Sequence, residues 1–471
     1  MTRVEEYVAS LGLDAYVVGG VVRDELLGHP SKDADFLVVG VDAASLRARL
    51  EPHGRVEDLV VAGRPVGLRL YPRDRGVHGL APAGIEFAPP RRERSTGPGR
   101  HDFEIVVDPG ASVEDDLARR DFTVNAMARH LVDGTLVDPY GGRDDLERRV
   151  LRTVSPRSFA EDPLRLVRGL RLVSQLDLDP DEETLREMHE EAQSVRLVSG
   201  ERIGGGLGAD GMGELSKLLL GLHPRKALRL ARDTAVLEAL LPELAPSIAF
   251  DQESPHHELT LDEHVFAVVQ SAADAGRPLR VRLAALFHDA GKPAVAWRGD
   301  DGRLHFYGKP GVARDHAEVG AELAAAALRR LRYPNDLRDR VVRIVRFHTL
   351  ELGNADARRA RRLLSRHGDE LTLDLLDHRD ADLRGKGGDG ALDEVEVERL
   401  AFFREVVERE RGSPHRLSQL AVDGADLIEL GYRPGPELGR VLGRLLDAVV
   451  EDPSLNRRET LLARAKELLP G

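Results

Sequence analysis

A glycine pair followed by two carboxylates near the N-terminus most constrains the fold of this chain. Gly19 and Gly20 end a short apolar run, and the residues from there to Leu27 have the spacing of a helix. Asp33 and Asp35 then lead into a second apolar run. Because strand side chains alternate between faces, both carboxylates lie on one face of the second predicted strand. The pattern predicts a strand, a tight turn, a helix and another strand.

The same residues indicate a chemistry. Two carboxylates on one strand face repel each other unless a cation lies between them, and ligand sets made only of oxygen favour Mg²⁺. Glycine N–H groups at a helix N-terminus bind phosphate. We therefore expect Asp33 and Asp35 to hold Mg²⁺ and Gly20 and Arg23 to bind a triphosphate, as in metal-assisted nucleotidyl transfer. Alone, an Asp-x-Asp pair is usually a solvated turn and a Gly-Gly pair a tight connection, so the expectation rests on their occurring together.

Length and composition bound the protein class. With 471 residues, 41% of them hydrophobic and 32% charged, the chain is expected to hold two to four domains. It has no run of 18 apolar residues and no visible export signal, so we expect a cytoplasmic protein without a membrane partner. The absence of cysteine excludes disulfides, thiolate metal sites and cysteine nucleophiles.

The net charge of −13 is unusual for a protein that binds nucleic acid, because phosphate groups are met by Lys and Arg. The net charge does not describe the local distribution of charge, however, and the sequence contains two clusters of arginine. Each is compatible with a solvated face or with a restricted RNA surface. The clusters are Arg91, Arg92, Arg94 and Arg100, and Arg358, Arg359, Arg361, Arg362 and Arg366.

The hydrophobic pattern changes near residue 140. Before it, short apolar runs alternate with helical segments, and after it the pattern is helical with short loops, which predicts an α+β protein. Breaks rich in Pro and Gly divide the chain into residues 1–140, 141–250, 251–395 and 396–471.

Within this outline we predict individual strands and loops. The Gly/Pro/Arg-rich segment 89–99 is expected to be a mobile loop, and the glycine-rich segment 204–213 a surface loop. Strands are expected at residues 15–18, 35–39, 67–70, 84–88 and 103–107.

Two further clusters carry unusual charge. Residues 114–128 place six charged groups beside a short apolar helix, which is costly to bury without partners. After Glu161, charged residues recur every third position on a helix that begins near Pro163, so that neighbours touch: Asp162, Arg165, Arg168 and Arg171. An Asp acceptor beside an Arg fork can read the edge of a base. A salt bridge that caps the helix is the plainer interpretation, and the spacing leaves it open.

The helical half holds a second candidate site. An apolar helix ends in His288 and Asp289, and His264 precedes them on another helix. His316, His348 and Asp382 follow later in the chain.

Residues 16–40 resemble the head of the class II tRNA nucleotidyltransferase and bacterial poly(A) polymerase family. The resemblance covers roughly residues 14–450, and it includes the motifs RRDFT at 119–123 and EDxxR at 161–165. It departs from the family at the glycine-rich insert and around His316. It implies a polymerase-β-like nucleotidyltransferase palm over residues 1–140, then helical neck/body, HD and tail domains.

The resemblance also implies roles for single residues. Arg120 and Asp121 would contact the nucleotide and its ribose. Independently of the resemblance, Glu86 lies on a predicted strand expected to neighbour the Asp pair, which makes it a candidate third catalytic carboxylate. Asp162 and Arg165 would select CTP or ATP. Arg168 and Arg171 would make further contacts with the nucleotide.

The His-Asp pair resembles the signature of HD phosphohydrolases. That resemblance implies four metal ligands: His264, His288, Asp289 and Asp382. Imidazole and carboxylate together suit Mn²⁺, Fe, Ni²⁺ or Mg²⁺, and the sequence does not choose among them. An HD domain kept only as a scaffold is the alternative.

We therefore expect template-independent addition or repair of the 3′-terminal CCA of tRNA from CTP and ATP, with Mg²⁺ as the cofactor. Poly(A) polymerase and CC- or A-adding enzymes share nearly all the motifs and remain open. From another class, an HD-centred phosphohydrolase with an inactive transferase domain is the rival, and an RNA-binding protein without activity is a weaker one. The oligomeric state is not indicated.

Overall fold

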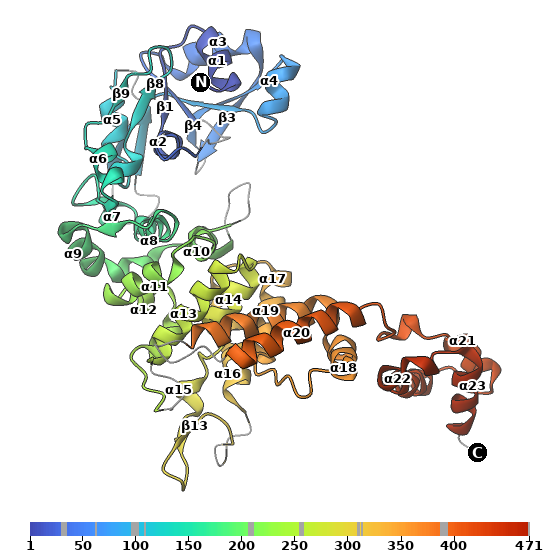
Figure 1. Ribbon diagram of the computed structural model, residues 1–471. Coiled ribbons are helices and arrows are strands. Elements are labelled where there is room, and N and C mark those ends of the chain that lie inside the picture. Colours follow the sequence, from blue (N-terminus) through green and yellow to red (C-terminus); the bar gives the residue numbers. More distant parts are fainter. Residues whose placement is uncertain are drawn as a thin grey trace. The chain divides into compact units, whose positions relative to one another are not determined.

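The computed structural model describes residues 1–29, 35–61, 64–95, 103–107, 110–205, 212–253, 259–308, 311, 314–386 and 394–469, with the side chains of 61, 64, 91–95 and 103–107 left aside. The chain divides into two compact units, Met1–Pro242 and Glu243–Gly471. Figure 1 shows a sheet near the N-terminus and helices in the rest of the chain, which confirms the predicted α+β class.

The first unit is built on a mixed sheet whose described strands follow the order β3-β4-β5-β2-β1-β8-β9. β2 and β5 are parallel, and the other neighbours are antiparallel. The strands are β1 (Ala15–Val18), β2 (Asp35–Val38), β3 (Gly54–Val61), β4 (Arg64–Pro72), β5 (Ile85–Ala88), β8 (Ala128–His130) and β9 (Leu136–Val137).

Alternation along these strands separates two apolar layers. Phe36 and Val38 face a core that is covered by α1 (Arg3–Ser10), α2 (Gly20–Leu26), α3 (Ala43–Leu50) and α4 (Arg75–Leu80). Leu37 faces the opposite side and packs with Val113 and Leu117 of α5 (Val113–Leu117). The sheet is therefore covered on both faces.

The strands predicted at 15–18 and 35–39 are confirmed as β1 and β2, and the other three predicted segments lie in β4, β5 and β7 (Phe103–Val107). The prediction of a loop at 89–99 was wrong in part. Arg91–Ser95 forms β6, which pairs antiparallel with β7. Its backbone hydrogen bonds come from an apolar partner strand, and its own charged sequence gave no strand signal. Residues 96–99 of that segment, and 206–211 of the predicted glycine-rich loop, lie outside the described residues.

Helices follow the sheet in the first unit. α8 (Leu164–Leu176) packs against α10 (Glu214–Leu219) and α11 (Pro224–Asp233). The others are α6 (Gly142–Glu147), α7 (Ser158–Glu161), α9 (Glu182–Glu190) and α12 (Val236–Leu240), and two short strands, β10 (Val150–Leu151) and β11 (Asp179–Pro180), pair with each other.

The described residues of the second unit form helices and one short hairpin, made by β12 (Trp297–Arg298) and β13 (Leu304–His305). α13 packs against α14 and α19, and α17 packs against α14, α16 and α19. Its helices are α13 (Leu261–Asp274), α14 (Leu279–Phe287), α15 (Lys292–Val295), α16 (His316–Arg330), α17 (Asn335–Arg346), α18 (Ala357–His367), α19 (Asp369–Gly385), α20 (Glu394–Glu410), α21 (Gly424–Glu429), α22 (Pro436–Glu451) and α23 (Arg458–Glu467).

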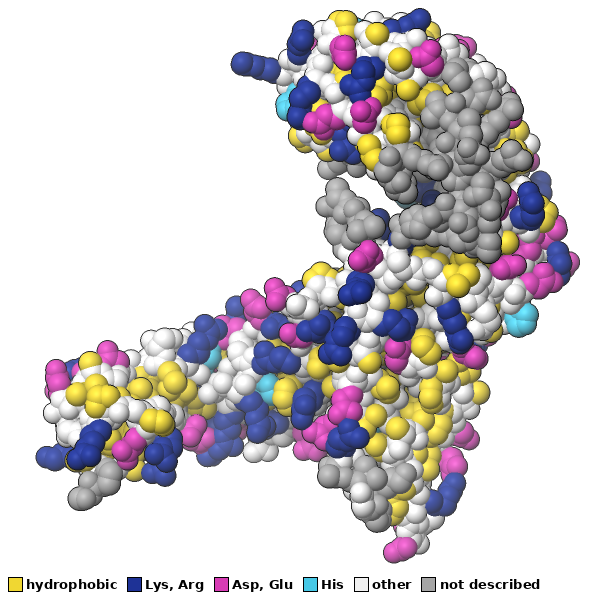
Figure 2. All heavy atoms as spheres, turned by 180° about the vertical axis from the view of Figure 1, so that it is seen from behind, with side chains coloured by type: hydrophobic (Ala, Val, Ile, Leu, Met, Phe, Trp, Pro, Cys, Tyr) yellow, Lys and Arg dark blue, Asp and Glu magenta, His cyan; other side chains and the backbone are white. Residues whose placement is uncertain are grey.

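Basic and acidic side chains are interspersed on the face shown in Figure 2. The arginine cluster of residues 358–366 illustrates this mixing. Arg361 is only 8% exposed and donates to the carbonyl oxygen of Val450 at 2.7 Å and to Oε2 of Glu410 at 2.9 Å. Arg362 donates to Oε1 of Glu451 at 2.5 Å. Part of this cluster therefore fastens α18 to α20 and α22.

The other predicted arginine cluster, at 91–100, has its side chains outside the described set. Among the helices that the structure describes, none is long and apolar enough to cross a bilayer.

Candidate active sites

The turn between β1 and α2 has room only for glycine. Gly19 has a φ of +76°, a conformation that residues with a Cβ rarely adopt. A Cβ at this position would also overlap Nη1 of Arg120. Nη2 of Arg120 donates to Oδ2 of Asp116 at 3.1 Å. Arg120, a predicted nucleotide ligand, therefore lies directly beside the predicted phosphate-binding turn.

Arg23 is held in a buried network below this turn. Its Nη1 donates to Oδ1 of Asn125 at 2.6 Å, and its Nη2 donates to Oδ1 of Asp24 at 2.6 Å. Nδ2 of Asn125 in turn donates to Oδ1 of Asp121 at 3.0 Å. Sequence reasoning gave Asn125 no role. The sequence offered one indication of a role for Asn125. It lies in the dense charged cluster, four residues after Asp121.

Asp121 joins this network to α8. Its Oδ2 lies 2.9 Å from Nη2 of Arg168. Burial raises the pKa of the Asp121 carboxyl, but the charge of Arg168 and the bond from Asn125 outweigh burial, and the net shift is downward. The charge of Asp121 raises the pKa of Arg168. Both groups are therefore ionised at neutral pH.

Asp116 anchors the arginines that follow α5. It is 1% exposed, and its Oδ1 accepts from Nη2 of Arg119 at 2.7 Å. Burial raises the pKa of its carboxyl, whereas the charges of Arg119 and Arg120 lower it, and the result is a lowered pKa. A buried carboxylate thus fixes two guanidinium groups at the edge of the turn.

The two residues predicted to select the base are bonded to different partners. Oδ2 of Asp162 accepts from Nη2 of Arg202 at 2.9 Å, and Oδ1 accepts from the backbone N–H of Leu164. Arg165 donates to the carbonyl oxygen of Arg119 at 2.8 Å and to Oγ of Ser158 at 3.0 Å. Arg165 therefore fastens α8 to the segment after α5, and Arg202 is a partner of Asp162 that sequence reasoning missed.

Arg171 is also paired. Its Nε lies 2.6 Å from Oε2 of Glu214 on α10, and its Nη1 donates to Oε1 of Gln175 at 3.1 Å. Glu214 lies just after the glycine-rich insert, so this ion pair joins α8 to the helix that follows the insert.

Two of the three predicted metal carboxylates, Asp35 and Glu86, lie on neighbouring strands. Asp35 begins β2 and is exposed, and Asp33 lies outside the described residues. Glu86 on β5 is the register partner of Asp35, and it forms an ion pair with Arg69. By strand alternation Asp35 shares the sheet face of Leu37, which packs on α5. Asp35 and α5, which the two arginines follow in the chain, therefore lie on one face of the sheet.

Two buried donors on this side remain unsatisfied. Nε of Arg120 and Nε of Arg168 have no hydrogen-bond partner among the described residues. A buried N–H group without an acceptor is costly, and on a guanidinium it is suited to an anion. Each of the two guanidinium groups thus keeps one N–H that no described residue accepts.

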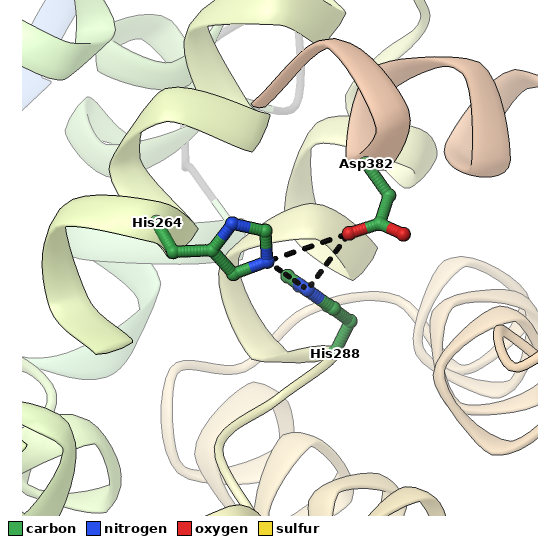
Figure 3. Close-up of side chains that lie close together, drawn as sticks. All are labelled: His264, His288 and Asp382. Carbon is green, nitrogen blue, oxygen red and sulfur yellow. Dashed lines mark hydrogen bonds and ion pairs between the residues drawn. The ribbon is translucent and has the colours of Figure 1, made fainter. Parts of the chain in front are cut away.

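The second unit brings together His264 of α13, His288 at the end of α14, and Asp382 of α19 (Figure 3). The Nε2 atoms of the two histidines are 3.3 Å apart. Oδ1 of Asp382 lies 3.4 Å from Nε2 of His264 and 3.8 Å from Nε2 of His288. All three residues are buried, and their ligand atoms are close enough to share one metal ion.

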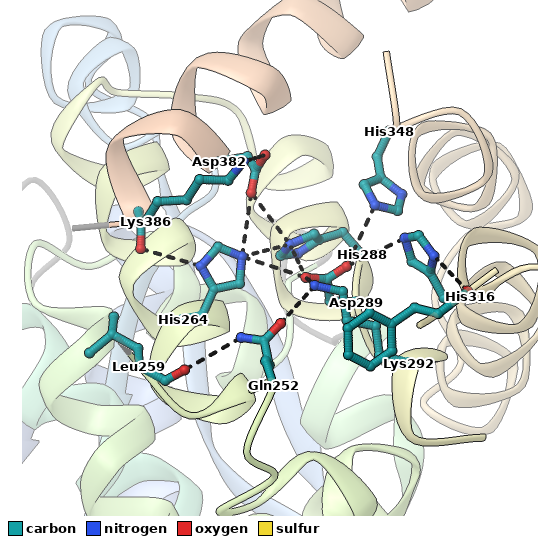
Figure 4. Close-up of polar contacts among 12 residues, drawn as sticks. Gln252, Leu259, His264, His288, Asp289, Lys292, His316, His348, Asp382 and Lys386 are labelled. Atoms are coloured by element: carbon teal, nitrogen blue, oxygen red, sulfur yellow. Dashed lines mark hydrogen bonds and ion pairs between the residues drawn. The ribbon is translucent and has the colours of Figure 1, made fainter. Parts of the chain in front are cut away.

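Asp289 lies between this group and two further histidines (Figure 4). Its Oδ2 is 3.2 Å from Nε2 of His288. Its Oδ1 is 3.7 Å from Nε2 of His316 and 3.6 Å from Nε2 of His348. The structure therefore brings the four predicted HD ligands together, and it places two histidines to which the sequence gave no role on the other oxygen of Asp289.

The carboxylates of this site are held ionised. Burial raises the pKa of Asp289, but the nearby His288 and Lys292 outweigh it and bring the pKa well below its ordinary range. Nζ of Lys292 lies 2.7 Å from Oδ2 of Asp289 and donates to Oε1 of Gln252 at 2.8 Å. Imidazoles and ionised carboxylates at these distances fit a divalent metal ion.

Family models match three parts of the chain. Residues 15–152 match the Poly A polymerase head domain, residues 177–248 the probable RNA and SrmB-binding site of polymerase A, and residues 261–383 the HD domain.

The chain is 39% identical over 345 residues to the Multifunctional CCA protein of Azoarcus sp. (strain BH72), which covers 71% of this chain and 73% of that protein. The chain belongs to this family. It is also 34% identical to the Multifunctional CCA protein of Cupriavidus taiwanensis over 83% of this chain and 90% of that protein.

Solved structures with the family fold span nearly the whole chain. The CCA-adding enzyme of Bacillus stearothermophilus in complex with CTP has a TM-score of 0.67 at 23% identity, covering 99% of this chain and 98% of that chain. The Thermotoga maritima CCA-adding enzyme complexed with tRNA has a TM-score of 0.56 at 20% identity, covering 99% and 94%. At these identities the likeness shows the fold.

Proposed function

We propose that this protein adds or repairs the 3′-terminal CCA of tRNA, using CTP and ATP without a nucleic-acid template. The 39% identity to a Multifunctional CCA protein over 73% of that protein's length carries this proposal. The network of carboxylates and guanidinium groups around the turn after β1 also supports the proposal, because such groups can bind the phosphates of a nucleotide. The reaction joins the 3′-oxygen of the RNA to the α-phosphorus of the nucleotide, and pyrophosphate leaves.

Asp33 and Asp35 are the residues that would hold Mg²⁺, with Glu86 beside them. When bound, such an ion lowers the pKa of the attacking hydroxyl and neutralises charge on the leaving pyrophosphate. Gly20 at the start of α2 offers backbone N–H to phosphate, and Arg120 supplies a fixed positive charge beside it.

Arg23 has a different role in this proposal. Its guanidinium is buried and donates hydrogen bonds to Asp24 and Asn125. Arg23 therefore holds the network next to the turn in place and contributes a positive charge near the proposed phosphate site. Asp121 and Arg168 carry that network to α8, where the nucleotide base would be read.

Base selection is proposed for Asp162 and Arg165, with Arg168 and Arg171 as further contacts. Asp162 is fixed by Arg202, and Arg165 by backbone and hydroxyl oxygens. The orientation of these groups is therefore set before a base binds. Selection between CTP and ATP without a template requires such fixed hydrogen-bonding groups.

Incubation of the protein with a tRNA that lacks its 3′ end, Mg²⁺ and CTP, ATP or both tests the proposal. We expect growth by three nucleotides only when both nucleotides are present, and no growth with Asp33→Ala or Asp35→Ala. A long ladder of products with ATP alone would identify a poly(A) polymerase. Addition that stops after two C residues would identify a CC-adding enzyme. Addition of A only to a tRNA that already ends in CC would identify an A-adding enzyme. No growth under any condition would reject the transferase proposal.

A metal-dependent phosphohydrolase activity of the second unit is a second candidate function. The match of residues 261–383 to the HD domain and the buried group of His264, His288 and Asp382 favour it. Hydrolysis of 2′,3′-cyclic phosphates or nucleotides, present with Mn²⁺, Ni²⁺ or Mg²⁺ and lost in Asp382→Asn, would support it. Absence of hydrolysis with every metal would leave the HD domain as a scaffold.

A further inference from the structure

The arginines of α17 and α18 fall into two groups. Six of the nine form ion pairs with carboxylates. No carboxylate of the described residues pairs with the other three, which are Arg343, Arg359 and Arg366. Arg343 and Arg366 are exposed, and Arg359 is partly exposed and donates to the carbonyl oxygen of Glu351 at 2.8 Å. The described part of the protein thus leaves three positive charges without a counterion, in a chain whose net charge is −13.

The three unpaired arginines gather at the end of α18. Arg359 and Arg366 are seven residues apart, so they lie on the same face of that helix. Arg343 of α17 reaches the same place, because its Nη2 donates to the carbonyl oxygen of His367 at 3.4 Å. The three cations therefore form one group contributed by two helices.

The side chain of His367 reports the charge of this group. Burial lowers its pKa, and the charges of Arg366, Arg343 and Arg359 lower it further, to about 4. His367 is therefore uncharged at neutral pH, and the positive charge here belongs to the arginines alone. Because like charges repel, such a group of unpaired cations is suited to an anion from outside the chain.

An aromatic ring lies beside these cations. Phe347 follows α17 and is 38% exposed, and its ring centroid lies 4.8 Å from that of His367. Proteins that bind single-stranded RNA combine cations that follow the phosphates with aromatic rings on which bases stack. Phe347 and the arginines provide both kinds of group in one place.

The residue types favour RNA over an acidic peptide. All three cations are arginines, whose planar fork binds two phosphate oxygens at once, whereas a lysine acts as a point charge. Phosphates that alternate with bases would use the cations and the exposed ring together. Carboxylates of a peptide would use the cations and leave the ring exposed.

We propose that Arg343, Arg359, Arg366 and Phe347 form an RNA-binding surface that belongs to the second unit. The arginines bind phosphates of an unpaired strand, and Phe347 stacks on one of its bases. Phe347 directly precedes His348 in the chain, so the surface adjoins the second candidate site. The inference rests on the proposed function for its RNA substrate, and it requires no hydrolysis.

Ultraviolet crosslinking on the full chain tests this inference without requiring turnover. The probe is a short single-stranded RNA that contains 4-thiouridine, and mass spectrometry of the digested protein locates the crosslinks. We expect a crosslinked peptide that spans the end of α17 and includes Phe347. Titration of the yield of this peptide measures the affinity of this surface alone, whatever RNA the first unit binds.

A triple variant then tests the arginines. Arg343→Gln, Arg359→Gln and Arg366→Gln together are expected to weaken binding at this peptide about tenfold or more. The slope of log affinity against log salt concentration should also fall by about 2, because three phosphate contacts are lost.

The matched control removes the same charge elsewhere in the second unit. It combines Arg298→Gln, Arg314→Gln and Arg330→Gln, since these exposed arginines each pair with a glutamate. The control is expected to keep the crosslink and the salt slope of the wild-type protein.

Phe347→Leu tests the ring and keeps the inference testable if the triple variant misfolds. We expect it to weaken binding about fivefold or more and to leave the salt slope unchanged, because stacking carries no charge.

Three results would overturn the inference. They are the absence of the crosslink in the wild-type protein, equal affinity of the triple variant and its control, and tighter binding of polyglutamate than of RNA at this surface. The last would identify an acidic protein partner instead. A chain that crosslinks at Phe347 without adding CCA would contradict only the transferase proposal, and one that adds CCA without the crosslink would contradict only this inference.

Discussion

Gly19 and Arg120 form the closest contact at the proposed nucleotide site of this protein. A guanidinium that is fixed by Asp116 lies where a side chain on residue 19 would be. The turn and the arginine after α5 are thus a single unit, although the chain separates them by about a hundred residues.

Gly19→Ala is expected to lower kcat/KM for nucleotide addition by at least about tenfold, because Arg120 must leave its place. The positive φ adds about 1–3 kcal/mol of backbone strain. Gly134→Ala is the matched control, since Gly134 has a φ of +74° and nothing within 4 Å of its added Cβ. Thermal unfolding of both variants measures the backbone strain that they share. Primer extension measures the loss of activity that only the displacement of Arg120 would cause. Equal activity of the two variants would contradict the role of Arg120.

Asp116 gives the first unit a defined response to acid. Its folded pKa lies below the ordinary value of 3.8, so its contribution to stability is present above that value and is lost as pH falls through the folded pKa. We expect the wild-type protein to lose unfolding free energy below about pH 4 more steeply than Asp116→Asn. Denaturant titrations at pH 7, 4 and 3 measure this difference. Parallel losses in the two proteins would show that Asp116 does not contribute.

At the scale of elements, the structure is predictable from sequence where a pattern is local. β1, β2 and α2 were predicted from a few residues of alternation and two glycines. β6 was missed, because Arg-Arg-Glu-Arg-Ser has no apolar alternation and becomes a strand only by pairing with β7. β3, β8 and β9 went unpredicted as well, since short or half-exposed strands carry little apolar signal.

The same limit applies to the sites. Motif residues such as Asp121 and Arg168 were singled out from the sequence, and their mutual contact was not. Arg202 pairs with Asp162 from 40 residues away, and no periodicity relates the two positions. His316 and His348 were noted as histidines, yet only the packing of α16 and of the end of α17 near α14 places them on Asp289.

The attachment of α18 to α22 depends on a buried arginine. Arg361→Ala would leave two carbonyl oxygens without their side-chain donor and Oε2 of Glu410 with Ser413 alone, so we expect a loss of about 3 kcal/mol in unfolding free energy. Arg366→Ala on the same helix is the control, because Arg366 is exposed, and it is expected to change stability by less than about 0.5 kcal/mol. Denaturant unfolding measures both. Similar losses would show that helix propensity, rather than these bonds, is responsible.

At the scale of the molecule, the two candidate sites belong to different compact units. We therefore expect their activities to separate by mutation. His348→Gln should leave the rate of CCA addition within about twofold, whereas Asp35→Ala should abolish addition and leave the Mn²⁺ content of the second unit unchanged. Primer extension and metal analysis on the same preparations test this. Loss of CCA addition in His348→Gln with its fold intact would show coupling between the units.

The position of β1 in the sheet has a consequence for how the protein is made. β1 lies between β2 and β8, and its register pairs Val18 with Ala128. The site also requires α8, because Arg168 of α8 binds Asp121. During translation the first 120 residues therefore emerge without a complete sheet, and a nascent chain cannot complete its proposed nucleotide site until the ribosome has released residues beyond 170. Substrate can thus stabilise the protein only late in its synthesis, and a chain stalled before that point is exposed to proteases and chaperones rather than protected by CTP or ATP.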